Sequence, residues 1–212
     1  MQNFRLIQFE KFEEDPLNNP LCIVGMPGIA DIGKFAVDLL IGVLKAKKYC
    51  DIIFNDYPAG AIVENSVLST PKAEILYYKD PKENRDIVLV TADAQAMSPR
   101  GIYEISDYIT SILFNLGIKK IVSLGAYPIQ KNDKETGGIK TKVFVSTTHP
   151  EKISSFLNNP EMVKLNKGVI IGSNGLIPTL AKARFNMEGA VLLAETDKSA
   201  VLNDNFTDLE AS

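Results

Sequence analysis

The sequence has no tryptophan, a single histidine and only two cysteines among its 212 residues. Cys22 and Cys50 show no CxxC or metal-ligand spacing, and metal sites usually draw on several Cys or His side chains. We therefore expect two free, mostly buried thiols, no metal and no cofactor. Such thiols are typical of a reducing compartment, which favours a cytoplasmic location. His149 has no serine or cysteine motif beside it, so the sequence offers no support for a hydrolase triad.

Long apolar runs and an excess of one charge are also absent. No stretch approaches the ~20 residues that a membrane helix needs, and the N-terminus has no apolar signal segment. The 23 basic and 26 acidic side chains give a net charge of -3. A nucleic-acid binder normally shows a basic excess or stripe, so we expect neither a membrane nor a nucleic-acid partner.

What the chain does have is a 45% apolar composition, enough for a substantial core. We expect one α/β domain over residues 1–212, with an acidic, polar tail at 203–212 that frays. Short apolar runs read as strands, and segments with helical spacing lie between them. The expected strands are 4–9, 21–24, 51–54, 61–63, 73–78, 87–91, 121–124, 141–146, 169–171 and 190–194. The expected helices are 32–45, 98–116, 150–157 and 176–185, with an exposed loop at 131–138.

This alternation of strands and helices predicts a three-layer α/β/α sandwich around a mostly parallel or mixed central sheet. Ligands of such sheets bind outside the carboxyl ends of the strands. A crevice, if present, should therefore be built from the loops that come after the strands. Its candidate residues are Gly25, Pro27, Gly28, Asp31, Gly33, Asp93, Arg100, Gly125, Gly172, Gly175 and Glu195.

One of these loops resembles a phosphate-binding loop. Gly28 to Lys34 matches G-x-x-x-x-G-K, but the next residue, Phe35, stands where a magnesium-binding Ser or Thr is required. Asp31 within the loop would also repel a phosphate. The glycines have a structural use as well, because they permit a tight turn and close packing of the following helix on the sheet. A helix N-terminus that binds an anion remains the weaker alternative.

Several polar and aromatic residues carry alternatives. Asp93 and Glu195 come after apolar strands and either hold a ribose or base in a phosphorylase-like enzyme or cap neighbouring helices. Arg100 either binds an anion or pairs with Glu104 at helical spacing. Tyr77 and Tyr78 either form an exposed tip for self-association or half-buried edges of the core.

Five segments appear in an order and spacing that resemble one known family. They are Leu21–Gly33, Val88–Thr91, Ile121–Gly125, Gly172–Leu176 and Glu188–Thr196. Across about residues 20–197 the chain resembles the proteasome-assembly chaperone family in its archaeal branch. That resemblance implies a nucleoside phosphorylase-like sandwich, self-assembly into a homo-oligomer, and binding to proteasome α subunits.

Chaperones of this type often end in a hydrophobic-Tyr-any tripeptide that docks on the α ring, whereas this sequence ends Leu209-Glu210-Ala211-Ser212. This leaves three alternatives: the natural chain extends further, it docks otherwise, or it does not bind the proteasome. The leading hypothesis is a non-enzymatic, homo-oligomeric assembly factor that binds other proteins. The alternative is a nucleoside- or phosphate-binding enzyme of the phosphorylase type.

Overall fold

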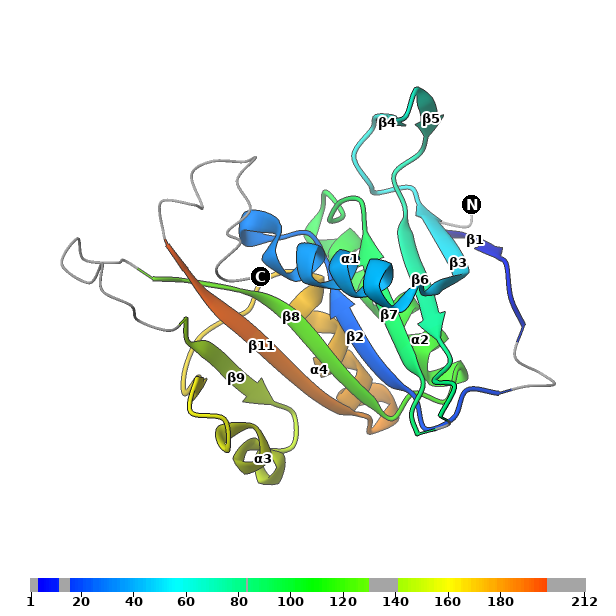
Figure 1. Cartoon of the computed structure of the whole chain (residues 1–212). Helices are drawn as coiled ribbons and strands as arrows, with labels where there is room; N and C mark the ends of the chain where they lie inside the picture. The colour runs from blue at the N-terminus through cyan, green and yellow to red at the C-terminus, as the bar shows by residue number, and fades with distance from the viewer. Residues whose placement is uncertain (1–3, 12–15, 83, 130–140, 198–212) are drawn as a thin grey trace.

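The computed structural model describes residues 4–11, 16–82, 84–129 and 141–197, and these residues build a large sheet with helices on both faces (Figure 1). The nine strands of the sheet lie in the order β1-β3-β6-β7-β2-β8-β11-β9-β10. Their bounds are β1 Phe4–Gln8, β2 Leu21–Gly25, β3 Lys47–Phe54, β6 Ala73–Tyr78, β7 Ile87–Ala92, β8 Lys120–Ile129, β9 Val143–Thr147, β10 Met162–Lys164 and β11 Glu188–Asp197. A separate two-stranded hairpin consists of β4 Ile62–Glu64 and β5 Val67–Ser69.

The centre of the sheet is parallel and its flanks are mixed. Strands β7, β2, β8 and β11 run parallel to one another. On one flank β1, β3 and β6 pair in antiparallel fashion with their neighbours. On the other flank β9 is antiparallel to β11 and parallel to β10. Of the parallel strands at the centre, β2 and β7 are short, mainly apolar and largely buried, which is the pattern typical of central strands. The mixed sheet predicted from the alternation of elements is confirmed.

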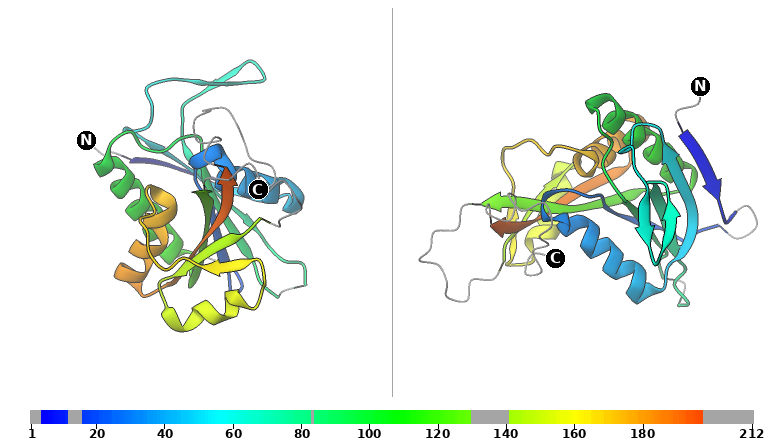
Figure 2. Two further views of the ribbon diagram at one scale, coloured as in Figure 1. Left: turned by 90° about the vertical axis from the view of Figure 1, so that its left-hand side faces the viewer. Right: turned by 90° about the horizontal axis from the view of Figure 1, so that it is seen from above.

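The helices form the two outer layers (Figure 2). Helix α1 Ile32–Leu44 lies on one face, whereas α2 Pro99–Asn115 and α4 Ser173–Phe185 pack side by side on the other. The short α3 Ile153–Leu157 lies near β9 and β10 at one edge. The three-layer arrangement predicted from the sequence is therefore confirmed.

Helix α2 begins where the sequence places its start. The hydroxyl of Ser98 accepts a hydrogen bond from the Gly101 N–H at 2.9 Å, and Pro99 occupies the first helical position, where a missing N–H costs nothing. The helix stops before Gly117, whose φ of +76° suits glycine. Local sequence thus sets both ends of this helix.

The hydrophobic core is divided between the two faces of the sheet. The larger part lies under α2 and α4, where Ile105, Ile109 and Leu113 are fully buried. The smaller part lies under α1, around Val37 and Leu89. The outer side of α1 remains largely exposed, as the 70% exposure of Val43 shows.

Two differences from the expected elements shape the carboxyl end of the sheet. The expected strand at 169–171 does not form; this segment leads into α4 with Val169 and Ile171 exposed. Strands β8 and β11 continue far beyond the end of β2, pairing with each other up to Ile129 and Asp197. The loop expected at 131–138 and the frayed tail expected at 203–212 lie outside the described residues. Within the described ranges, no helix has the length and hydropathy to cross a membrane.

Candidate functional site

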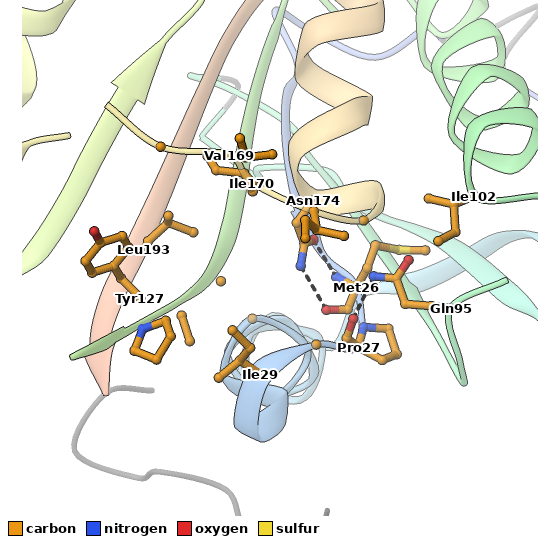
Figure 3. A pocket seen from close by; sticks show the side chains of 18 of the residues that line it. Met26, Pro27, Ile29, Gln95, Ile102, Tyr127, Val169, Ile170, Asn174 and Leu193 are labelled. Carbon is orange, nitrogen blue, oxygen red and sulfur yellow. Dashed lines mark hydrogen bonds between the residues drawn. The ribbon is translucent and has the colours of Figure 1, made fainter. Parts of the chain in front are cut away.

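A crevice of about 650 Å³ opens at the carboxyl ends of β2, β8 and β11 (Figure 3). One wall is the glycine turn after β2, with Met26, Pro27 and Ile29. A second is the extended part of β8 and β11, with Tyr127 and Leu193. The remaining wall is the segment 168–172 before α4. Five of the residues expected from the sequence line it, namely Pro27, Gly28, Gly33, Gly125 and Gly172.

The side chain of Asn174 closes the floor of this crevice. Its amide oxygen accepts from the Met26 N–H at 2.9 Å, and its amide nitrogen donates to the Met26 carbonyl at 3.1 Å. Both residues are buried, so each bond satisfies a backbone group that water cannot reach. The amide therefore acts as a short strand partner for the end of β2 and ties α4 to it.

Gln95 performs a similar task on the side of α2. Its amide nitrogen donates to the Pro27 carbonyl at 2.7 Å, and its amide oxygen accepts from the Ser173 N–H at 3.3 Å. The amide packs closely over Gly172, whose φ of +90° also calls for glycine. Three loops that are remote in sequence are thus fixed to one another.

The glycine turn after β2 contains a carboxylate that bonds one of its own backbone N–H groups. The carboxylate of Asp31 accepts a hydrogen bond from the Gly28 N–H at 3.1 Å, which fills the position an external anion would need. Lys34 is paired with Asp38 at 2.9 Å, so its ammonium does not reach into the turn.

Gly25 and Gly33 serve close packing. A Cβ on Gly25 would overlap the Gly33 carbonyl oxygen, and one on Gly33 would overlap the Leu124 carbonyl oxygen. The turn therefore shapes the backbone and lets α1 lie directly on β2 and β8.

The charged candidates do not line the crevice. Asp93 accepts from the Lys72 N–H at 3.0 Å, and burial raises the pKa of its carboxyl above the ordinary value. The Arg100 side chain is 84% exposed and pairs with Glu104. Glu195 accepts from the Lys142 N–H at 3.4 Å, beside the start of β9.

Gly175 lies at the base of the 168–172 segment, where a Cβ would come within 2.6 Å of the Ile170 carbonyl oxygen. His149 lies elsewhere, with its ring nitrogens beside Lys182 and Thr148. Among the described residues that line the crevice, none is charged.

Sequence reasoning identified the loops but missed the side chains that organise them. Gln95 follows β7 by three residues, and Asn174 lies in the first turn of α4. Their position in loops or turns that were expected to build the crevice is the signal by which they were recognisable. Ile29, Tyr127 and Leu193 supply apolar surface and look like ordinary core residues in the sequence. The resulting site is a mainly apolar recess in which the carboxamides of Gln95 and Asn174 hold the walls together, with the Tyr127 hydroxyl as a further polar group of the lining.

The fold and the recess together define an α/β/α scaffold suited to contact with apolar surface. Comparison with known proteins makes the assignment specific: the PAC2 family model matches residues 22–211, and the chain belongs to the PAC2 family.

Individual relatives agree with this membership. The chain is similar to PbaB of Pyrococcus furiosus, described as an archaeal proteasome activator, with 27% identity, a TM-score of 0.83, and coverage of 95% of this chain and 83% of PbaB. It also shares its fold with PbaA of the same organism, described as an archaeal homologue of proteasome-assembly chaperone, with 22% identity, a TM-score of 0.69, and coverage of 92% and 73%. An uncharacterised protein of Methanocaldococcus jannaschii is 27% identical over 183 residues, which are 86% of this chain and 67% of that protein.

Proposed function

We propose that this protein is a homo-oligomeric factor that binds proteasome α subunits and assists the proteasome. The observation that carries the proposal is the likeness to PbaB, which extends over 95% of the chain at a TM-score of 0.83. Membership of the PAC2 family and the shared fold with PbaA agree with it. Self-association and recognition of α subunits are the parts that experiment has to establish.

The chemistry of the crevice supports a protein partner. A site for a nucleoside or phosphate needs charged or hydrogen-bonding groups aimed at the ligand. Here the lining described carries no charge, and the two carboxamides, Gln95 and Asn174, already bond backbone groups. Exposed apolar side chains at the same end of the sheet, such as Met97 at 71%, are typical of protein interaction surfaces.

The proposal is tested by binding to purified α subunits from the same source. The protein is immobilised, and α subunits, assembled α rings and complete core particles are passed over it in turn. We expect saturable binding of at least one of these at micromolar concentration or below. An unrelated protein of the same net charge serves as the control. If none of the three forms binds more strongly to this protein than to the control, the proposal is contradicted.

Two functional assays then separate the roles suggested by the two relatives. An assembly factor should increase the rate at which separate α subunits form rings, as monitored by light scattering. An activator should increase the hydrolysis of a fluorogenic peptide by complete core particles without changing ring formation. An effect in neither assay, despite binding, would limit the function to docking.

A further inference from the structure

The hairpin formed by β4 and β5 projects beyond the carboxyl ends of the parallel strands (Figure 1). It connects β3 to β6, and Asn65 and Ser66 in its turn both have positive φ, at 48° and 66°, the backbone geometry of a tight hairpin turn. Val63 lies opposite Leu68 in the register. An isolated two-stranded hairpin is marginally stable in water, so this one needs a surface to pack on.

The hairpin exposes apolar side chains that nothing in the described chain covers. Val63 and Val67 are each 66% exposed, and Leu68 is 71% exposed. Branched side chains of this kind are costly to leave in water and favour burial against another apolar surface.

The crevice offers such a surface. It has room for several side chains at about 650 Å³, within the usual range of ligand sites, and its described lining is uncharged. Its rim carries Val169 at 87% and Ile171 at 86% exposure, so the apolar surface continues from the recess onto the outside of the segment 168–172.

Hairpin and crevice lie at the same end of the sheet but on opposite sides of β7. The hairpin leaves the sheet at β3 and β6, whereas the crevice is built on β2, β8 and β11. A two-fold axis through this end of the sheet can therefore bring each hairpin to the crevice of the other copy. Such an isologous contact requires that one molecule carry both complementary surfaces, and this chain does.

We propose that two copies of this chain associate by exchanging these hairpins, each β4–β5 hairpin docking its apolar side chains in the crevice of the other copy. The proposal rests on the self-association contained in the proposed function and names the surface that forms it.

The size and charge of the two surfaces fit a second copy. Six apolar side chains on the two surfaces are each at least 66% exposed, namely Val63, Val67, Leu68, Met97, Val169 and Ile171. Together they offer several hundred Å² of apolar area, which is of the order of the ~800 Å² that each partner gives to a stable interface. Glu64 next to the hairpin turn and Lys167 next to the crevice rim have no ion-pair partner among the described residues. Docking brings a negative tip to a positive rim.

Two complementary variants test the exchange. The hairpin variant, Val63→Thr/Val67→Thr/Leu68→Thr, keeps strand-forming residues while it removes apolar surface. The crevice variant, Gly28→Phe, fills the recess from a position where the φ of -175° suits any residue and an added Cβ meets nothing closer than 3.9 Å. The matched control, Leu39→Gln/Val43→Gln, removes exposed apolar surface from the outer side of α1.

Multi-angle light scattering and sedimentation over a concentration series give the oligomeric state, and circular dichroism verifies that each variant is folded. We expect the wild type and the control to associate alike, and the hairpin and crevice variants each to weaken association by at least tenfold. A mixture of the two variants should associate again, because the intact hairpin of one docks in the intact crevice of the other.

Other results would overturn the proposal in distinguishable ways. Three results with an oligomeric wild type would reject the hairpin exchange: both variants associate as the wild type does, the control variant dissociates, or the mixture of the two variants does not associate again. Each of them would leave the proposed function intact. Hairpin variants that stay oligomeric but lose α-subunit binding would assign the hairpin to the proteasome instead. A wild type that is monomeric at micromolar concentration would reject self-association altogether.

Discussion

The close approach of α1 to the sheet predicts opposite effects for the same substitution at two glycines of this helix. A Cβ on Gly33 would overlap the backbone carbonyl of Leu124, whereas one on Gly42 would have no atom within 4 Å. Backbone cannot rotate away as a side chain can, so Gly33→Ala must shift α1 against β8 by on the order of 1 Å. Overpacking of this kind costs about 1–3 kcal/mol and occasionally more, and we expect ~3 kcal/mol here. Gly42→Ala should instead stabilise the helix by about 0.5–1 kcal/mol.

The measurement is thermal unfolding of both variants and the wild type at one protein concentration, since self-association would otherwise shift the midpoint. For a chain of this size 1 kcal/mol corresponds to roughly 2–4 °C. Gly33→Ala should therefore melt about 6–12 °C below the wild type, and Gly42→Ala about 1–4 °C above it. A Gly33→Ala protein that melts within about 2 °C of the wild type would refute the reasoning that these glycines permit close packing.

Three further predictions concern polar groups that are buried or half-buried. Asn174→Leu leaves the N–H and carbonyl of Met26 unpaired. At 1–3 kcal/mol for each group, this should lower the free energy of unfolding by about 2–6 kcal/mol. The control Asn166→Leu, at an exposed position, should shift the thermal midpoint by less than about 2 °C. Burial alone raises the pKa of Glu74, but hydrogen bonds from Lys48 and Lys72 outweigh it and leave the net pKa lowered. The stabilisation by Glu74 is therefore present above the unfolded pKa of about 4.3 and lost as pH falls through the folded one. Glu74→Gln should lower stability by about 1–3 kcal/mol at pH 7, and a difference from the wild type that fails to shrink below pH 4 in urea titrations would contradict this origin. Burial raises the pKa of Cys50 to about 12 and that of Cys22 further still. A thiol reagent at pH 8 should therefore react with neither cysteine in the folded protein and with both in urea. Rapid reaction of the native protein would contradict this and show that these strands open.

The elements that could be predicted are those whose signal is local. Ser98 and Pro99 mark the start of α2, and the apolar run at 87–90 marks β7, because a cap or a buried strand is recognisable from a few adjacent residues. The segment 169–171 shows the limit of such reasoning. Its three β-branched residues are typical of a strand, yet none of the described strands pairs with it, and Val169 and Ile171 are exposed.

The location of the candidate site was predictable from the sequence, but the chemical character of its lining was not. Strand ends next to glycines located five lining residues, since ligand sites in parallel sheets form there. The contribution of Asn174 depends on a hydrogen bond to a residue 148 positions away in sequence, and no local pattern carries that information. Tyr77 illustrates the same point, because it is buried with its hydroxyl donating to Glu10, which favours the core-edge alternative over an exposed tip.

By itself the sequence determined the three-layer architecture, a mostly parallel or mixed sheet and the family, because these depend on hydrophobic periodicity and on the order of motifs along the chain. Only the tertiary structure decided that the glycine turn holds its own carboxylate, that the crevice lining described is uncharged, and that an apolar hairpin and an apolar recess share one end of the sheet. The physical reason is that charge, burial and exposure at a site depend on which distant segments meet there, and that is settled only when the chain has folded.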